Sequence, residues 1–531
     1  MKKILLLFSS MYFFGCVSVT NAVLDNDRYD REFLIATDYF NNQEFDKAAA
    51  IYEDILKEHK DSYIAAKLAE VYLAERQPEK AKRLLEDMLK DKKFKDDDYL
   101  NFYLGKILIE YLNQLDEGKK YIENAAKINE DEQYLEYLAR IYEAKEDFSS
   151  AIGIYSKLIA KDNNPEYYYK RGYLYIKLGL LKDAISDLMK ADDYQPNFRA
   201  RLLLSDVYIS QNEYEKAAKY LKKALELNSQ FPSVKLKLAE VYKKLGMTND
   251  YAKILEDILD SYQGKQREYI LRQLAAAFFE LKDYDNAIKY FTFVLNDSPE
   301  DTQALFFLGV VYEAKGDIEN AIKFYEKAYS VRNDYFEPLK RIAYLVYKNK
   351  KYDLAVNYLD KVGEQGRDIE YFRLKAAIYE DMGEIALAIK VVEDGLLKNP
   401  ESEELLFSYA ILMEKEKKHK EVINTMKKLL EINPKNPTYL NFLGYLYADI
   451  GINLDEAYDL IKSALKYEPE NAAYLDSMAW VLYKMKRYKE AYDFQLKALK
   501  KSPSEKEMRE HMLEIMKALN IDKPIDDVIK D

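Results

Sequence analysis

The residues that most often perform chemistry in proteins are few and scattered in this chain. There are three histidines, His59, His419 and His511, and one cysteine, Cys16. Because these four residues lie far apart in the sequence, they predict neither a Cys/His metal cluster nor a disulfide framework. The sequence contains no Gly-rich phosphate loop and no H-E-x-x-H or G-x-S-x-G motif. Carboxylates are numerous, but runs such as E-Y-E-K (213–216) are typical of a solvated helix surface. We therefore expect no enzymatic activity, no metal site and no cofactor.

Cys16 is the one position at which the sequence indicates a covalent modification. Two lysines and an apolar run (2–14) have the layout of a secretory signal and are too short to span a bilayer comfortably. The run ends in F-F-G-C (13–16), which resembles the lipobox of bacterial lipoproteins, with Phe13 where that family prefers leucine. The resemblance implies that residues 1–15 are a signal peptide and that Cys16 is the lipidated first residue of the mature chain.

The residues after the cysteine indicate where such an anchor would hold the chain. They show no hydrophobic period, so we expect residues 16–28 to comprise the lipidated cysteine and a tether. Val17 is not the aspartate that directs lipoproteins of the best-studied bacteria to the inner membrane. The resemblance thus implies a periplasm-facing protein anchored in the outer membrane. The alternative is that Cys16 is one more small apolar residue of a signal that is cleaved elsewhere.

The elements that would position any site are helical repeats. Two consecutive stretches, 437–469 and 472–503, nearly match. The motif L-G-x-x-Y at 443–447 and the small residues after it resemble the tetratricopeptide repeat, a helix–turn–helix unit. The resemblance implies an all-α fold, an α-solenoid whose repeats wind into a right-handed superhelix. Three pairs of residues in the two stretches are 34 positions apart, namely Ala457 and Ala491, Ala464 and Ala498, and Pro469 and Pro503.

The same pattern extends over residues 29–505 and predicts an array of about fourteen repeats. Small residues in both helices of a repeat allow close approach, while Leu and Tyr fill the gaps between helices. Prolines and glycines fall at the expected repeat ends, starts and turns rather than inside helices. The repeats are expected to begin near Tyr29, Ser62, Asp98, Glu132, Pro165, Phe198, Pro232, Glu268, Thr302, Phe336, Ile369, Glu403, Pro437 and Ala472.

Two of these repeats depart from the pattern. The repeat from Asp98 has Glu117 and Gly118 where the small-residue pattern is expected, and the repeat from Pro232 has an extra residue before Ala252. Irregular repeats bend a superhelix or mark a break between sub-domains. The alternative is sequence drift in a tolerant repeat.

The segment 506–531 is predicted to form a capping helix and a tail. A repeat array needs a terminal helix with one polar face to close its core. The alternative is a soft, Met-rich surface for a partner helix, since thioether side chains adapt to varied shapes. We expect residues 521–531 to be frayed. The apolar residues that recur at helical spacing are Met508, Met512, Ile515, Met516 and Leu519.

The first helices of the repeats are expected to line a concave groove that holds protein partners. Aromatic residues and arginine are good anchors because they contribute large desolvated contact areas. Trp480, the one tryptophan, has a second interpretation as a packing residue at the last repeat interface. The groove candidates are Tyr169, Tyr173, Phe306, Arg373, Asn441, Tyr445, Asp476 and Trp480.

Charge and motif content narrow the class of partner. The net charge of −12 argues against general nucleic-acid binding, which needs a basic face to neutralise phosphates. The groove positions show no Lys/Asn carboxylate clamp of the kind that cytosolic co-chaperones of this family use. Three motifs resemble the C-terminal repeats of tetratricopeptide lipoproteins of the Gram-negative envelope: N-F-L-G-Y (441–445), L-D-E-A (454–457) and Y-L-D-S-M-A-W-V-L-Y (474–483).

That resemblance implies a non-enzymatic scaffold or adaptor of the bacterial envelope. Some members of the group bring a periplasmic processing protease to cell-wall hydrolases. The sharpest form of the hypothesis is therefore an adaptor that presents substrates to a periplasmic protease. The alternative is an assembly factor for an outer-membrane machine, such as a pilus or a polysaccharide-export system. Resemblance in fold does not by itself establish a shared partner.

Overall fold

The computed structural model describes residues 27–530. Every regular element in that range is a helix, and the helices follow one another in pairs, which confirms the predicted all-α repeat fold. The predicted signal peptide, Cys16 and nearly all of the tether lie outside the described residues. No helix between residues 27 and 530 has the length and apolar character needed to cross a membrane.

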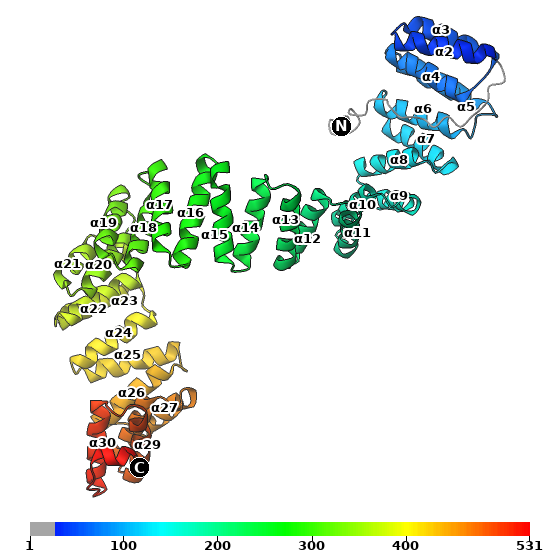
Figure 1. Ribbon diagram of the computed structural model, residues 1–531. Coiled ribbons are helices and arrows are strands. Elements are labelled where there is room, and N and C mark those ends of the chain that lie inside the picture. The colour runs from blue at the N-terminus through cyan, green and yellow to red at the C-terminus, as the bar shows by residue number, and fades with distance from the viewer. Residues whose placement is uncertain (1–26, 531) are drawn as a thin grey trace. The chain divides into compact units, whose positions relative to one another are not determined.

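The chain divides between Gln263 and Gly264 into two compact units. In the N-terminal unit each helix lies beside the next along the chain, as the blue to green ribbon of Figure 1 shows. Its α-helices are α2 (Asp27–Asn41), α3 (Phe45–Glu58), α4 (Ser62–Ala74), α5 (Pro78–Lys90), α6 (Asp98–Glu110), α7 (Leu115–Ile128), α8 (Glu132–Ala144), α9 (Phe148–Lys161), α10 (Pro165–Lys177), α11 (Leu181–Tyr194), α12 (Phe198–Ser210), α13 (Tyr214–Leu227), α14 (Pro232–Lys244) and α15 (Thr248–Ile258).

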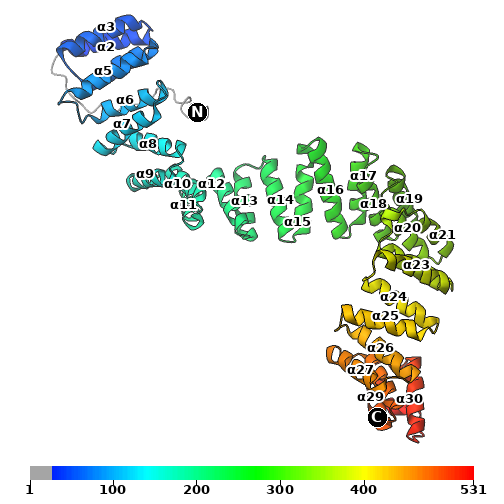
Figure 2. The same cartoon turned by 180° about the vertical axis from the view of Figure 1, so that it is seen from behind.

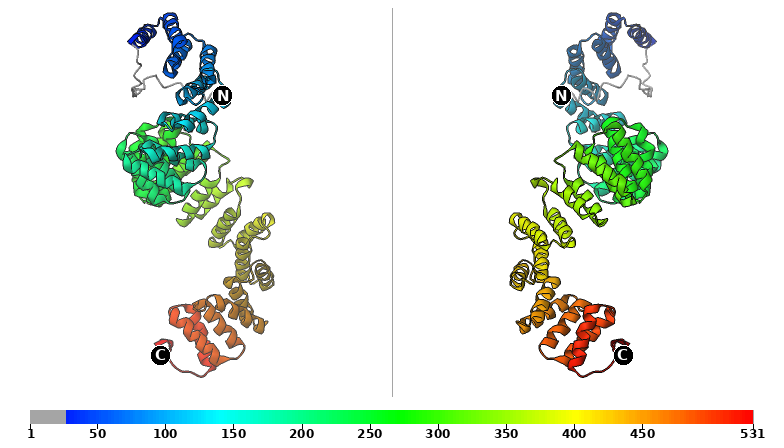
Figure 3. Two further views of the ribbon diagram at one scale, coloured as in Figure 1. Left: turned by 90° about the vertical axis from the view of Figure 1, so that its right-hand side faces the viewer. Right: turned by 90° about the vertical axis from the view of Figure 1, so that its left-hand side faces the viewer.

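The C-terminal unit continues the same arrangement, and Figure 2 shows its helices from behind. The orange and red helices at its end are packed side by side in both views of Figure 3. Its α-helices are α16 (Gly264–Glu280), α17 (Tyr284–Asp297), α18 (Thr302–Lys315), α19 (Ile318–Val331), α20 (Glu337–Lys348), α21 (Tyr352–Asp360), α22 (Ile369–Asp381), α23 (Ile385–Lys398), α24 (Glu403–Lys415), α25 (His419–Ile432), α26 (Pro437–Ile450), α27 (Leu454–Tyr467), α28 (Ala472–Lys484), α29 (Tyr488–Lys501), α30 (Lys506–Ala518) and α31 (Ile525–Lys530).

The pair α18 and α19 shows how local sequence builds one repeat. Asp301 caps α18, because its carboxylate accepts a hydrogen bond from the backbone N–H of Ala304 at 2.7 Å. Gly316 ends the helix in the left-handed conformation, at a φ of 87°. Gly309 lets α19 come close, since a Cβ at that position would lie 2.6 Å from the ring of Tyr325. Small residues therefore set the helix spacing, as the pattern predicts.

The two irregular repeats differ in structure. In the repeat from Asp98, a Cβ on Gly105 of α6 would lie 2.9 Å from the carbonyl oxygen of Gly118 in α7, so these two glycines let the helices approach closely. Gly118 thus serves as a small residue of this helix pair. In the repeat from Pro232, α15 is followed by a 3-10 turn, η1 (Leu259–Ser261), and the boundary between the units comes directly afterwards. This second irregularity fits the interpretation of a sub-domain break.

The last helices close the core of the C-terminal unit. Met508, Met512, Ile515 and Met516 of α30 are all buried, and α30 packs on α29 and α28. The expectation of a frayed tail is wrong for its last described turn. Ile525 and Val528 of α31 are 8% and 2% exposed and belong to the same apolar cluster as the methionines, because they lie three residues apart on one helix face.

Candidate functional site

Aromatic rings on four successive first helices of the N-terminal unit form a continuous series, which we call the N-terminal ladder. Neighbouring ring centroids are between 4.6 and 6.1 Å apart, within the range in which aromatic pairs attract each other. The ladder comprises Phe33 of α2, Tyr63 of α4, Tyr99, Phe102 and Tyr103 of α6, and Tyr137 of α8.

The ladder combines buried and accessible rings with positive charge. Phe102 is buried, Tyr99 and Tyr103 are half-buried, and Tyr63 is 39% exposed. The Lys106 ammonium lies 5.6 Å from the centroid of the Phe102 ring. Burial raises the pKa of Tyr99 and that of Tyr103, so the neutral phenol is favoured more strongly than in a free tyrosine. Such a strip can accept apolar or aromatic side chains of a polypeptide.

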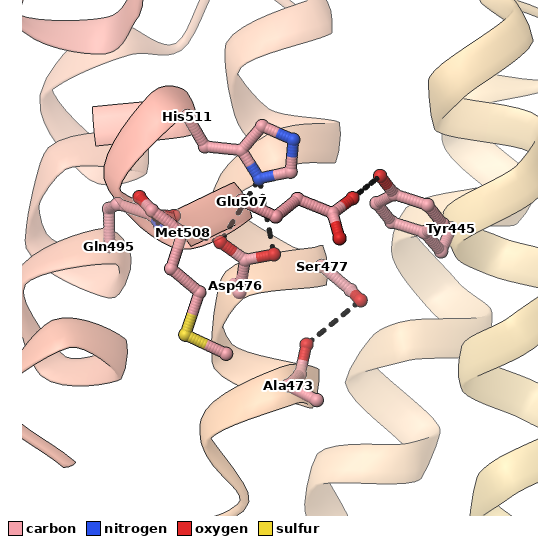
Figure 4. A network of polar contacts seen from close by, with 8 residues as sticks. All are labelled: Tyr445, Ala473, Asp476, Ser477, Gln495, Glu507, Met508 and His511. Carbon is pink, nitrogen blue, oxygen red and sulfur yellow. Dashed lines mark hydrogen bonds and ion pairs between the residues drawn. The ribbon is translucent and has the colours of Figure 1, made fainter. Parts of the chain in front are cut away.

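The second site lies where α30 meets the first helices of the last repeats, and Figure 4 shows its polar contacts. His511 Nδ1 lies 3.1 Å from each carboxylate oxygen of Asp476. Gln495 Nε2 donates to Asp476 at 2.5 Å and to the carbonyl oxygen of Met508 at 2.8 Å. A buried carboxylate is costly unless such partners surround it. We call Tyr445, Asp476, Trp480, Gln495, Glu507 and His511 the C-terminal cluster.

The aromatic members of the C-terminal cluster, Tyr445 and Trp480, contact side chains of α30. The Tyr445 hydroxyl donates a hydrogen bond to the Glu507 carboxylate, and burial together with that bond raises the pKa of Tyr445. The indole of Trp480 stacks on the His511 ring, with centroids 4.0 Å apart and an interplanar angle of 18°. On α28 itself, Trp480 also stacks on Tyr483 at 5.1 Å. These contacts support the packing interpretation of Trp480.

The structure brings three of the predicted groove residues together around His511 of α30. Asp476 and Trp480 both contact His511, and the Tyr445 ring lies 6.3 Å from the same imidazole. Asn441 is one repeat before Asp476, and its Oδ1 is buried without a hydrogen-bond partner among the described residues. Asp476 is 6% exposed, so it is an internal residue rather than an open groove contact.

The other predicted residues lie apart from this cluster. Tyr169 and Tyr173 are on α10 in the N-terminal unit, where Tyr173 is 36% exposed and the Lys177 ammonium lies 5.2 Å from its ring centroid. Phe306 of α18 is partly buried against the ring of Tyr325, at 5.4 Å. Arg373 is exposed on α22. Phe306 thus takes part in packing, while Tyr173 and Arg373 have accessible side chains.

Sequence reasoning missed the N-terminal ladder and three members of the C-terminal cluster, Gln495, Glu507 and His511. Tyr63 and Tyr99 are each the second residue of a first helix, and that shared register was the signal for the ladder. His511 stands three residues after Met508 on the apolar stripe of α30. A polar residue on a face predicted to be buried is the signal that could have pointed to an internal partner.

The described residues offer little to a metal ion. Between residues 27 and 530, no group of three or more His, Cys, Asp or Glu side chains is arranged to hold one. The two sites themselves offer aromatic stacking, burial of apolar groups and hydrogen bonding.

Comparison with family models finds repeats along most of the chain. A model described as anaphase-promoting complex, cyclosome, subunit 3 matches residues 144–224. Models described as tetratricopeptide repeat or TPR repeat match residues 39–103, 206–246, 233–264, 272–337 and 312–378.

Individual proteins show the same likeness. The chain is 32% identical over 163 residues to a TPR repeat-containing protein of Borreliella burgdorferi, covering 28% of this chain and 69% of that protein. It is 28% identical over 202 residues to a TPR repeat-containing protein of Pseudomonas aeruginosa, covering 38% of this chain and 34% of that protein. The chain thus spans about a third of the length of this second relative. A solved structure, the C-terminal part of a TPR repeat-containing protein from Cytophaga hutchinsonii, aligns with a TM-score of 0.39 and 18% identity over 46% of this chain and 99% of that chain.

Sequence, structure and comparison agree on the unit from which this protein is built. The repeat models match both compact units, and the described helices form successive pairs with glycine at their close contacts. With the 32% identity to the Borreliella burgdorferi relative, these findings show that the chain belongs to the tetratricopeptide-repeat proteins.

Proposed function

We propose that this chain is a non-catalytic scaffold that binds a protein partner along the N-terminal ladder. Tetratricopeptide proteins are in general protein-interaction scaffolds, and nothing in the relatives indicates catalysis. The observation that carries the proposal is the run of contacting aromatic rings across α2, α4, α6 and α8.

The physical basis of the proposal is the low entropic cost of binding on rigid rings. Tyr63, Tyr99 and Tyr103 are held by their neighbours, so little side-chain freedom remains to be lost when a partner binds. Large aromatic side chains also remove much apolar surface from water for each contact. Tyr169 and Tyr173 on α10 belong to a later first helix of the same unit, and we include them as further contacts of a long partner segment.

We further propose that the scaffold works in the bacterial envelope, held by lipid at Cys16 and facing the periplasm. The signal-like residues 1–15 and the position of the single cysteine support this placement. A membrane-held scaffold raises the local concentration of any partners it binds together. In its sharpest form the proposal makes the chain an adaptor that brings substrates, cell-wall hydrolases among them, to a periplasmic protease.

The partner surface is tested with a ladder variant in affinity capture from the native envelope. Tyr63→Ala/Tyr103→Ala should reduce partner recovery about tenfold while the helical circular dichroism stays unchanged. Tyr269→Ala is the control, because Tyr269 lies on α16, a first helix of the C-terminal unit, and is 49% exposed. Equal recovery by the ladder variant and the wild type would overturn the ladder as the binding surface. A protease with its substrates in the eluate supports the adaptor form, whereas pilus or polysaccharide-export components would replace it with an assembly role.

Anchoring is tested separately. Cys16→Ser should move the protein from the membrane fraction to the soluble fraction, because a lipid chain is then absent. A variant that still sediments with the outer membrane contradicts the proposed anchor and leaves the ladder proposal unaffected.

A further inference from the structure

A cavity of about 560 Å³ opens between α27 and α29, the second helices of the last two repeats. Leu475 and Met478 of α28 line it, and both are buried in the surrounding core. Tyr458 and Leu465 of α27 and Phe494 of α29 supply apolar wall surface. The C-terminal cluster uses other residues of α28, Asp476 and Trp480, so the cavity is a separate feature.

Four lysines line the cavity in two pairs. In each pair the lysines are four residues apart on one helix, so they project from the same face one turn apart. The lysines therefore come from both of the helices between which the cavity opens. The pairs are Lys462 and Lys466 on α27, and Lys497 and Lys501 on α29.

The one carboxylate among the lining residues is already paired. Glu470 forms an ion pair with Lys501, whose hydrogen bond lowers the pKa of the Glu470 carboxyl. The ammonium of Lys497 lies 5.3 Å from the Phe494 ring centroid, and that of Lys462 lies 5.5 Å from the Tyr458 ring centroid. The lining as a whole keeps an excess of positive charge, in a chain whose net charge is −12.

This lysine pattern distinguishes the last pair of second helices from the pairs before it. The four positions are the ninth and thirteenth residues of α27 and the tenth and fourteenth of α29. In the preceding pair, α25 and α27, the residues at these positions are Lys427, Glu431, Ser463 and Tyr467. In the pair before that, α23 and α25, they are Glu393, Leu397, Lys428 and Ile432.

We propose that this cavity binds an acidic segment of a partner protein, with an apolar side chain against Leu475 and Met478 and carboxylates paired with the lysines. Charge complementarity carries the choice of an acidic ligand. Because two lysines come from each of the helices that border the cavity, the proposed ligand carries negative charge on both sides of its apolar part. A peptide with carboxylates flanking an aromatic or aliphatic residue has that distribution, whereas a single-chain lipid carries its charge at one end.

The site extends the interaction surface beyond the ladder. It lies in the C-terminal unit on second helices, whereas the ladder lies in the N-terminal unit on first helices. Binding at the cavity and binding at the ladder therefore fail independently of each other when one surface is altered.

The test is fluorescence anisotropy with the full chain and a labelled synthetic peptide in which one phenylalanine is flanked on each side by glutamates. Wild type should bind the probe, and Lys462→Glu/Lys497→Glu should weaken binding about tenfold or more, since two favourable charge pairs become repulsive. Lys323→Glu/Lys327→Glu is the matched control, because these two lysines are exposed on α19, a second helix of the same unit. The control should bind like wild type, and circular dichroism should be the same for all three proteins.

A second probe, in which serine replaces the phenylalanine, reports on the apolar lining. It should bind at least about fivefold more weakly than the first, because the buried apolar contact is lost. Any of three results with the peptide probes would overturn the proposal: no binding of the first probe by wild type, equal binding of both probes, or equal weakening by the control variant. Binding of anionic phospholipid vesicles that the Lys462→Glu/Lys497→Glu variant loses while peptide binding persists would assign the cavity to a membrane surface instead.

Discussion

The first helices near the two ends of the described chain use aromatic side chains differently. In α4 and α6, Tyr63 is exposed and Tyr103 is half-buried, and their rings contact other ladder rings. In α26, Tyr445 contacts Glu507 of α30. In α28, Trp480 contacts His511 of α30. Equivalent helices thus carry an accessible surface in one unit and an internal contact in the other.

The reason lies in the position of a repeat within the array. An internal repeat packs against the next one, while the last repeat has no successor and would expose its apolar face. Here α30 takes the place of that successor and buries Met508 and Met512. Its His511 then joins Gln495 of α29 as a partner of the buried Asp476 carboxylate. A position in the groove register therefore does not by itself make a residue available to a partner.

The largest effect on the free energy of unfolding is expected from a substitution on the buried face of α30. Met512→Ala should lower the free energy of unfolding by about 2–4 kcal/mol, because Met512 is fully buried and its loss leaves a cavity. Leu513→Ala on the same helix is the control; Leu513 is 54% exposed, and a change below about 0.5 kcal/mol is expected. Urea unfolding measures the stability of both variants. Equal midpoints for the two variants would mean that α30 does not close the core.

A smaller effect is expected from removing the polar contact under α30. Asp476→Ala should cost about 1–3 kcal/mol, because Gln495 loses its side-chain acceptor in a buried site. Trp480 is the one tryptophan, so its emission reports on this site alone, and a looser His511 stack should shift the emission to longer wavelength. Asp493→Ala, at an exposed position of α29, should leave the emission unchanged. An unshifted spectrum for Asp476→Ala would contradict the inference that Asp476 holds His511 of α30 in place.

The smallest effect is expected in the N-terminal unit, at a tyrosine whose hydroxyl is satisfied within the repeats. Tyr142 of α8 donates to Glu123 of α7 at 2.7 Å, and burial with this hydrogen bond raises the pKa of Tyr142 to about 12. The neutral phenol is therefore favoured in the folded state. Its contribution is fully present below the unfolded pKa of about 10 and is lost as the pH rises towards 12.

Tyr142→Phe should accordingly lower stability by about 0.5–1 kcal/mol at neutral pH, the net value of one hydrogen bond. The difference between variant and wild type should shrink as the pH rises from about 10 to about 12. Urea unfolding across this range measures it. A difference that stays constant with pH would mean that the phenol is not stabilised by Glu123.

Much of the fold could be predicted because repeats are local. Asp301, Gly309 and Gly316 each act within one helix pair, so their roles follow from spacing in the sequence. The candidate sites were less predictable. Tyr169, Tyr173 and Arg373 are residue types suited to binding, but whether such a side chain is free depends on what packs over it. The expectation of a frayed tail was wrong for its last described turn for the same reason, since Ile525 and Val528 pack with residues of α29 and α30.

The helices, their pairing and the residues at their close contacts follow from the sequence, because each of these depends on neighbours within about one repeat. The three-dimensional packing was needed to show that Tyr63, Tyr99 and Tyr103 form one series, that His511 lies against Asp476, and that four lysines line one cavity. Those contacts join side chains from different helices. They depend on how each helix is rotated and offset against the next, which propensity and periodicity do not specify.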